Sequence, residues 1–483
     1  MFRLDDGRMI LTATDLSVFP DCTHRTWLDQ GAALGAWGRP SGHDVFLDLL
    51  SRRGTQHETA YLQTLKDSYA AVREFPTPTY SPDALAAAQA QTLAAMTEGV
   101  EVLYQPTLFD GTFYGRPDFL VRVAGQSRLG PYQYQVRDTK LARSARAEAL
   151  VQTLSYARQV RDLGGSDRDA AIVLALGTGE QAAFRVEAGL SYVRRLEGRL
   201  LAEVTQWPRS STSAPVPACE LCPWHERCMT EWETADHLSL VAGIRGDQIR
   251  KLQEAGVHTA GDLALLDPGT RIPGMAPDIL ARLVDQAGLQ VSAANSGEGE
   301  SLKYRILPPQ VGRGFATLPA PSPLDLFWDL EGDPLDPDGS LEYLWGVGAW
   351  NGTEFIFKPT WAHDHAGERA AFEHFVDSVL DRWKRDPAMH VYHYGAYEPS
   401  VLKRLMGRYG TREQEVDRLL RAGVLVDLYA VVRQALRLSR PSYSLKEVEK
   451  FYGVRHGDIQ KAGQSVVRYA EWRDTGNPQA LAD

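Results

Sequence analysis

The 483-residue chain has no long uninterrupted apolar run, so the sequence shows no sign of a membrane-spanning helix. Its first residues, MFRLDDGRMILTATD, are acidic early and lack the apolar core of a signal peptide. We therefore expect a cytoplasmic protein without a membrane partner. The sequence also lacks a GxxxxGKS or GxxxxGKT phosphate-binding loop, so we expect no helicase motor within it.

The chain has no excess of positive charge, because 52 Lys and Arg stand against 62 Asp and Glu for a formal net charge of −10. This excludes little, since an enzyme that acts on nucleic acid needs positive charge only where the strand lies. Hydrophobic residues make up 43% and charged residues 24%, the usual balance of a globular protein. The length exceeds one ordinary core and predicts two or three domains.

Cysteine is scarce, and the four that occur are Cys22, Cys219, Cys222 and Cys228. Three of them fall within ten residues, and the fourth lies about 200 residues away. In a large cytoplasmic chain this pattern indicates a ligand set rather than a disulfide framework. Four thiolates suit either tetrahedral zinc or an iron–sulfur cluster, and either would join the two ends of a first domain.

Residues 115–140 predict a β-hairpin, because two extended apolar segments flank a short Gly/Ser/Pro-containing connection. Asp118 begins the first strand and Asp138 ends the second, while Lys140 shares the face of Asp138. Two carboxylates that hold a divalent cation, with an ammonium group beside them, form a metal-dependent phosphodiesterase site. The alternative is a surface hairpin with an ordinary charge pair.

Two helices are expected to accompany the hairpin. Residues 44–71 have helical spacing and contain His57, and Gly54 in the same helix suggests close packing there because glycine weakens a helix. A histidine in such a helix is more often a surface or capping residue than a ligand. Residues 145–163 form the second helix, in which Gln152 and Tyr156 share a face.

Taken together, His57, Asp118 in GRPDF, Asp138-Thr-Lys140, the Gln152-x3-Tyr156 pair and the split cysteine set resemble the RecB-like branch of the PD-(D/E)xK nucleases. The resemblance is closest to its iron–sulfur members, the CRISPR adaptation exonucleases and the AddB-type subunits. It covers residues 1 to about 235 and implies a restriction-endonuclease-like α/β domain.

This resemblance assigns roles to the residues that carry it. It implies that Mg or Mn is held by His57, Asp118, Asp138 and the main-chain carbonyl of Thr139. Lys140 would orient or activate the attacking water, and Gln152 and Tyr156 would lie near the DNA and the metal. It also favours a 4Fe–4S cluster over zinc on the cysteines, namely Cys22, Cys219, Cys222 and Cys228.

A change of character follows, since residues 236–290 predict a small helix-hairpin-helix segment. Such a segment can direct the backbone N–H groups of a helix start at a phosphate. A purely structural helical connector is the alternative, and no Lys/Arg cluster within the hairpin decides between them. Residues 291–323 are rich in Ser, Gly and Pro and predict a linker.

Residues 324–483 predict a third domain. The segment LDLFWDLEGDP reads as a strand with Asp329 and Glu331 on one face, and Glu398 follows a later strand. These acids resemble the first two motifs of a DnaQ-like, RNase H-fold 3′–5′ exonuclease, in which acids hold two metals about the scissile phosphate. Here Glu398 and His393 stand where that family usually has Asp and Asn.

The later motifs of that family match less well. Asp427 lies on a downstream strand, and we expect it to be structural. The final Tyr or His motif is not found, since Tyr469-x4-Asp474 has the wrong spacing within a helix-like segment. We therefore expect the RNase H-like domain to be incomplete at its C-terminus.

The order of parts resembles bacterial RecB-like nucleases with a C-terminal RNase H-like domain, some of which continue into a superfamily 1 helicase. The expected function is metal-dependent hydrolysis of phosphodiester bonds, on single-stranded DNA, in repair, recombination or DNA processing. The alternative is a non-catalytic nucleic-acid-binding module of a larger helicase–nuclease protein, with a helicase domain or subunit as partner. The sequence leaves open exo- or endonuclease action, polarity, DNA or RNA preference, pathway and oligomeric state.

Overall fold

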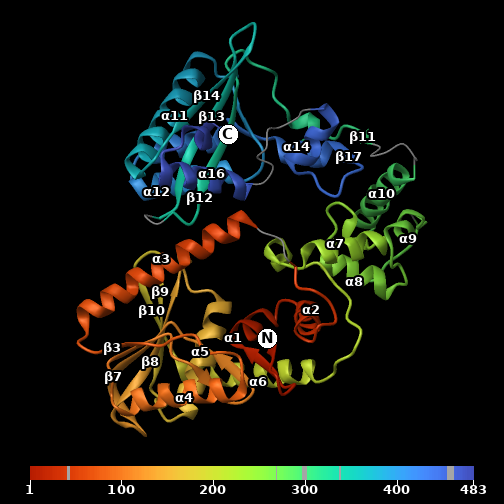
Figure 1. The fold of residues 1–483 in the computed structure, drawn as a ribbon. Helices are drawn as coiled ribbons and strands as arrows, with labels where there is room; N and C mark the ends of the chain where they lie inside the picture. Colours follow the sequence, from red (N-terminus) through yellow and green to blue (C-terminus); the bar gives the residue numbers. More distant parts are fainter. Residues whose placement is uncertain (41–43, 268, 296–301, 337–338, 454–461, 483) are drawn as a thin grey trace. The chain divides into compact units, whose positions relative to one another are not determined.

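The computed structural model describes the chain except for residues 41–43, 268, 296–301, 337–338, 454–461 and 483 (Figure 1). Internal contacts divide the chain into an N-terminal unit, Met1–Cys228, and a C-terminal unit, Met229–Asp336 with Ser340–Asp483. Within the described residues, no helix combines the length and apolar character needed to cross a membrane.

The N-terminal unit contains two sheets. The larger has the strand order β10-β9-β8-β7-β4-β3, with β3 (Val72–Glu74), β4 (Val102–Tyr104), β7 (Phe119–Ser127), β8 (Gly130–Lys140), β9 (Ala171–Leu176) and β10 (Gln181–Arg185). The smaller has the order β1-β2-β6-β5, with β1 (Phe2–Arg3), β2 (Met9–Thr12), β5 (Leu108–Phe109) and β6 (Phe113–Gly115). Strands β7 and β8 form the predicted antiparallel hairpin, and β9 lies parallel to β8.

The stretch of residues 100–110 is divided between the two sheets. β4 pairs with β7 in the larger sheet and β5 pairs with β6 in the smaller one. Gln105, between them, has a positive φ of 49°. A left-handed residue turns the chain sharply, which ends β4 and separates it from β5.

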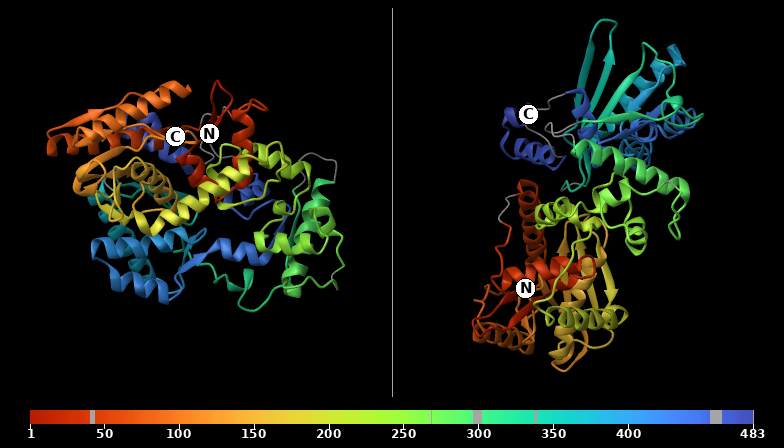
Figure 2. Two further views of the ribbon diagram at one scale, coloured as in Figure 1. Left: turned by 90° about the horizontal axis from the view of Figure 1, so that it is seen from below. Right: turned by 90° about the vertical axis from the view of Figure 1, so that its right-hand side faces the viewer.

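Helices cover both faces of the larger sheet (Figures 1 and 2). α3 packs Leu62 and Leu65 against Phe119 and Val121, and α5 packs against the opposite face, which carries Val136. The helices of this unit are α1 (Ala13–Val18), α2 (Thr23–Ala33), α3 (Val45–Ser68), α4 (Pro82–Thr97), α5 (Ala147–Asp162), α6 (Val186–Val204), the short η1 (Pro217–Leu221) and the start of α7 (His225–Thr234).

Local sequence explains where helices α3 and α4 begin. The side chain of Asp44 accepts the backbone N–H groups of Phe46 and Leu47 and caps α3. Ser81 caps α4. Proline follows at the first helical position, where its missing backbone N–H costs no helical hydrogen bond. The close packing expected at Gly54 is not found among the described residues, since none of their atoms lies within 4 Å of a Cβ added there. That glycine simply weakens an open helix face.

The C-terminal unit begins with a helical cluster formed by η2 (Leu238–Leu240), α8 (Gly246–Glu254), α9 (Ala260–Ala264) and α10 (Pro277–Ala294). Leu252, Leu263 and Leu283 are fully buried at its centre. Two tight turns precede α8 and α10, and each contains a glycine with positive φ, Gly243 at 75° and Gly274 at 71°.

The stretch predicted as a linker, residues 291–323, contains regular structure. It includes the end of α10, strand β11 (Tyr304–Ile306), which pairs with β17 (Leu436–Leu438), and η3 (Gly314–Thr317), which packs on α14 (Leu428–Ala435). Residues 296–301 of that prediction lie outside the described residues. β11 could not be predicted because all three of its residues are exposed, so it lacks the alternation of buried and exposed positions that predicts a strand.

A five-stranded sheet forms the rest of this unit, in the order β14-β13-β12-β15-β16. Its strands are β12 (Leu326–Asp333), β13 (Leu341–Trp350), β14 (Phe355–Trp361), β15 (Val391–His393) and β16 (Leu425–Asp427). The first three are antiparallel, and β15 and β16 continue the sheet in parallel. The remaining helices are α11 (His365–Arg385), α12 (Tyr397–Tyr409), α13 (Glu413–Arg421), α15 (Leu445–Glu449), η4 (Lys450–Tyr452), α16 (Ala462–Thr475) and α17 (Pro478–Ala482).

The two faces of β12 have different surroundings. Leu326, Trp328 and Leu330 belong to a buried core shared with residues of α11, α12 and α13. The intervening positions, which include Asp329 and Glu331, face the other way, where α16 contacts the strand. The apolar face therefore anchors the strand, and the polar face is left available for chemistry.

Candidate active sites

The end of the β7–β8 hairpin gathers the first acidic group. Asp118 directly precedes β7, and Asp138 lies opposite it near the end of β8. Asp118 Oδ2 accepts the backbone N–H of Thr139 at 2.7 Å and its hydroxyl at 2.6 Å. Asp138, with 1% of its surface exposed, forms an ion pair with Lys140. The hairpin thus fixes two carboxylates and one ammonium group within a few ångströms.

Electrostatics at this hairpin end follow from burial of like charges. Burial, and then the negative charge of Asp138, raise the pKa of Asp118 well above its ordinary value. Burial alone would lower the pKa of Lys140, but Asp138 and Asp118 outweigh it and raise that pKa. Lys140 is therefore charged at neutral pH and offers N–H donors and positive charge. Paired hard carboxylate oxygens of this kind suit a divalent cation such as Mg or Mn.

The predicted pair on α5 closes one side of this group. Gln152 Nε2 donates to the Tyr156 hydroxyl at 3.1 Å. Tyr156 is buried, and burial followed by the charge of Asp138 raises its pKa. Its ring fills the space beside Gly115, where an added Cβ would come within 2.4 Å of the ring. A glycine is required there because Tyr156 reaches past β6 towards the acids.

His57 lies on α3, on the other side of β8. Its Nε2 is 3.2 Å from the main-chain oxygen of Ala175, which pairs in register with Thr139. The structure therefore brings His57 to the neighbouring strand, with its imidazole on a backbone oxygen. The next residue, Glu58, was not singled out by the sequence analysis.

Glu58 belongs electrostatically to the hairpin group. Its negative charge contributes to the raised pKa values of both Asp118 and Lys140. Its Oε1 accepts a 2.7 Å hydrogen bond from Gln105 Nε2, which aims the carboxylate towards the hairpin. Its position directly after His57 could have identified it in the sequence, because neighbouring residues of a helix can both reach the same strand end.

The four cysteines all lie in the N-terminal unit and come from its two ends. Cys22 caps α2, and its sulfur accepts the N–H of Arg25 at 3.3 Å; the sulfur of Cys219 accepts the N–H of Val216 at 3.4 Å. Burial is the main cause of the raised pKa of Cys222, and nearby Cys219 and Cys22 add to it. Three of the thiols are thus neighbours, and backbone donors aimed at sulfur suit thiolate ligands.

The second acidic group lies on the polar face of β12. Burial and then the nearby Glu398 carboxyl group raise the pKa of Asp329 to about 6. Burial and then the charge of Asp329 raise the pKa of Glu331 to about 7. Like charges that repel one another in this way are stabilised by a cation placed between them.

Glu398 reaches this group from the first turn of α12. Its Oε2 lies 3.6 Å from His393 Nδ1 at the end of β15, and both side chains are buried. Neither of these two atoms has a hydrogen-bond partner among the described residues. Unsatisfied buried donors and acceptors are rare, so this pair fits a site that takes a further ligand, such as a divalent cation with its water.

Asp427 has the structural role expected for it. Its Oδ1 accepts the backbone N–H groups of Gly395, Tyr429 and Ala430, which caps α14 and ties it to the loop after β15.

Helix α16, the last but one of the described chain, approaches β12 without an acid at the predicted place. Tyr469 is buried in a stack with Tyr343, at 4.0 Å between ring centroids and 9° between planes, and its hydroxyl lies 3.2 Å from His363 Nδ1. Ser465 of α16 is hydrogen-bonded to Tyr343 and adjoins Glu331. Tyr469 is therefore a core residue, in agreement with its wrong spacing from Asp474.

Glu331→Gln should stabilise the metal-free protein at pH 8 by roughly 1–2 kcal/mol after allowance for solvent screening. The folded-state pKa of about 7 lies above the ordinary value of 4.5, so the favourable contribution of Glu331 is complete below pH 4.5 and is lost as the pH rises through 7. Glutamine removes that loss, and the difference should shrink towards zero at pH 4.5. Denaturant unfolding in EDTA at both pH values measures it.

Exposed Glu354, in the turn between β13 and β14, provides the matched control, since Glu354→Gln at an exposed position should change stability little. Equal effects of Glu331→Gln at pH 4.5 and pH 8 would contradict the assigned electrostatics.

Comparison with known proteins identifies one part of the chain. Residues 326–483 match the family model described as the RNase_H superfamily. Curated proteins give no match. The C-terminal domain is therefore RNase H-like, and this fold indicates nucleic-acid-processing nuclease activity in general. Asp329, Glu331 and Glu398 all lie within the matched range.

Proposed function

We propose that this chain is a metal-dependent nuclease that hydrolyses phosphodiester bonds of single-stranded DNA, in repair, recombination or DNA processing. The observation that best supports this is the hairpin end, where Asp118, Asp138 and Lys140 meet. The RNase H-like domain supports the substrate class. A nuclease that needs single strands also needs the duplex opened, which favours a helicase domain or subunit as partner.

The hairpin residues divide the chemistry between them. Asp118 and Asp138 would hold Mg or Mn, which when bound polarises the phosphate and lowers the pKa of water. Thr139 fixes the orientation of the Asp118 carboxylate through its N–H and hydroxyl groups. Lys140 would hold the attacking water and donate to the phosphate, while Gln152 and Tyr156 shield the acids from bulk solvent on the α5 side. His57 is the further proposed ligand and would have to leave the Ala175 carbonyl.

A second centre is proposed in the RNase H-like domain. The buried Glu398 and His393 atoms without partners, beside Asp329, support a cation site at that point. Asp329, Glu331 and Glu398 would hold the metals, and the longer Glu398 side chain takes the place of the usual aspartate. Two centres in one chain could each process the strand that a motor exposes.

The test is a cleavage assay on single-stranded DNA, double-stranded DNA and RNA with Mg and with Mn, using Asp138→Asn, Asp329→Asn and the double variant. We expect Asp138→Asn to remove most cleavage of single-stranded DNA, and Asp329→Asn to remove any remainder. Asp67→Asn, an exposed aspartate on α3, is the control. Tight binding without cleavage under any of these metals would instead support a non-catalytic binding module.

A further inference from the structure

A large cleft in the C-terminal unit lies next to the RNase H-like acids. It has a volume of about 1450 Å³ and is bordered by α10, by the segment around η3, by α14 and β17, and by the start of α15. Asp329 of β12 is one of its lining residues. Pockets for single small molecules usually occupy about 300–1,000 Å³, so this cleft suits a longer ligand.

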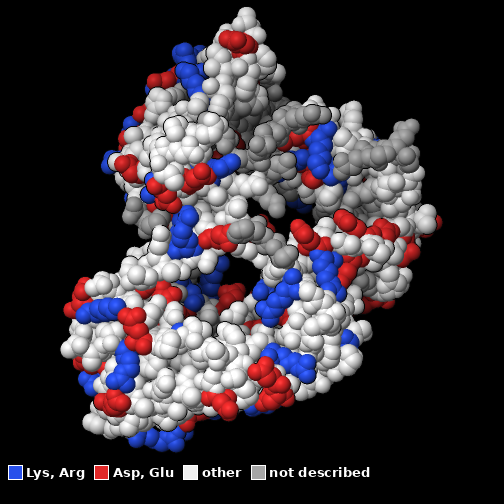
Figure 3. Space-filling view, in the orientation of Figure 1, with Lys and Arg blue, Asp and Glu red and all other residues white. Residues whose placement is uncertain are grey.

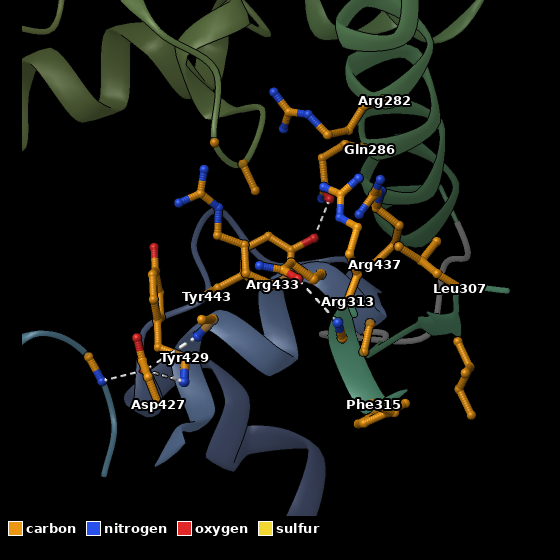
Figure 4. Close-up of a pocket in the computed structure, with 18 of the residues that line it drawn as sticks. Arg282, Gln286, Leu307, Arg313, Phe315, Asp427, Tyr429, Arg433, Arg437 and Tyr443 are labelled. Carbon is orange, nitrogen blue, oxygen red and sulfur yellow. Dashed lines mark hydrogen bonds between the residues drawn. The ribbon is translucent and has the colours of Figure 1, made fainter. Parts of the chain in front are cut away.

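The cleft is lined by positive charge although the whole chain is acidic. Its cationic residues are Arg282, Arg313, Arg433, Arg437 and Lys446 (Figure 4). Figure 3 shows basic side chains gathered over the segment that carries α14 and β17. Three carboxylates also line it, but Asp427 is engaged in capping α14 and Asp329 belongs to the proposed metal centre.

Most of these arginines lack an ion-pair partner among the described residues. Arg282, Arg313 and Arg433 form no ion pair within the part of the chain that the structure describes. Arg437 shares Asp285 with Arg305, so one carboxylate serves two guanidinium groups. Burial, and then the charges of Arg437 and Arg433, lower the pKa of Arg282. An anion bound between these guanidinium groups would relieve this repulsion.

The arginines are held in place by the elements that meet at the cleft. Gln286 of α10 donates to the main-chain oxygen of Leu438 at 2.7 Å and accepts from the Tyr443 hydroxyl at 2.7 Å. These bonds join the helical cluster to β17, so Arg282 on α10 and Arg437 on β17 face one cavity. The cationic lining is therefore built from segments more than 150 residues apart, as the Gln286–Leu438 bond shows.

Aromatic groups complete the lining. Phe315 has 44% of its surface exposed although it lies in the cleft, and Tyr394 and Tyr429 meet edge to face at 5.7 Å. An exposed ring beside arginines is the arrangement that binds unpaired bases, which stack on the ring while cations hold the phosphates. Paired bases inside a duplex could not stack in this way.

We propose that this arginine cleft binds the sugar-phosphate backbone of single-stranded DNA and leads its end to Asp329. This inference rests on the proposed nuclease function. Arg282, Arg313 and Arg433 would contact successive phosphates, and Phe315 would stack on a base. The helical cluster then acts in substrate binding through the side chains of α10.

The test measures binding of a fluorescein-labelled oligothymidylate of about 16 nucleotides to the full chain in EDTA, where no cleavage occurs. Arg282→Ala and Arg433→Ala should each weaken binding about three- to tenfold, and each lost phosphate contact should reduce the salt slope by about 0.7. Phe315→Ala should weaken it at least about fivefold. Arg421→Ala on α13, whose arginine is exposed and outside the cleft, is the control.

Unchanged affinity and salt slope in the arginine variants would overturn the inference, as would equal binding of a duplex of the same length. Arg433→Lys, which keeps the charge, should bind nearly as the parent does. Protection of these arginines from phenylglyoxal by the oligonucleotide tests the parent protein itself. If Asp138→Asn or Asp329→Asn abolishes cleavage while the arginine variants bind normally, the nuclease function stands and the cleft assignment fails.

Discussion

Lys140→Ala should lower the rate of Mn- or Mg-dependent cleavage by about 10²–10⁴-fold, the range found when a positioned proton donor or acceptor is removed. Lys140 pairs with Asp138 at the hairpin end, so its ammonium group is held where water and phosphate would meet the metal. Because its pKa is raised, it works first as a charged donor. Single-turnover cleavage of a labelled oligonucleotide measures the chemical step directly.

Alanine at this position has a structural cost that must be separated from the catalytic one. Asp138 is almost fully buried, and removing its cation leaves an uncompensated charge that can destabilise the fold by about 3–5 kcal/mol. Lys140→Gln also removes the cation but keeps a donor for Asp138, so it should lose less stability than Lys140→Ala and still lose most activity. Lys140→Arg keeps the charge and should recover part of it.

Lys66 is the matched control, since it is a partly exposed lysine of the same unit paired with Glu74. Lys66→Ala should leave cleavage unchanged. Full activity of Lys140→Gln would show that Lys140 takes no part in the reaction. If only Asp329→Asn loses activity, cleavage takes place at the RNase H-like centre instead.

Much of the site could be predicted from the sequence where the chemistry is local. Asp138 and Lys140 sit two residues apart on one strand, and Gln152 and Tyr156 sit four apart on one helix, so periodicity alone places each pair. The alternation of β12 likewise placed Asp329 and Glu331 on one face. In each case the backbone geometry is fixed by a regular element.

What escaped prediction depends on contacts between distant segments. Residues 236–290 contain no basic cluster in sequence, because only Arg282 of the cleft arginines lies in that stretch. Arg313 and Arg433 come from later segments that the fold brings beside it. β11 was concealed because a short exposed strand needs its partner β17 before it forms. Glu58 was overlooked because its charge acts on Asp118 and Lys140, which are brought near it only by the folded sheet and not by their spacing in the sequence.

The cysteine set provides the other large expected effect. If the cysteines hold iron or zinc as proposed, Cys222→Ala should abolish that metal binding and lower the free energy of unfolding of the N-terminal unit by on the order of 5 kcal/mol, because metal binding to thiolates contributes folding energy. Cys222 is half-buried, so loss of packing alone would cost well under about 1 kcal/mol. A large effect at such a position requires a shared ligand.

The same reasoning predicts that Cys22→Ala and Cys219→Ala behave alike, although Cys22 is about 200 residues from the others in sequence. Thr212→Ala, in the exposed stretch before the cysteines, should change neither stability nor metal content. Protein purified without oxygen should be brown and absorb near about 400 nm if a 4Fe–4S cluster is bound, whereas colourless protein with stoichiometric zinc would refute iron. If Cys22→Ala melts at the same temperature as the parent protein, Cys22 does not belong to the ligand set. The two ends of the unit would then be held together without a shared metal, by contacts such as the 2.8 Å hydrogen bond from Trp224 to Asp29.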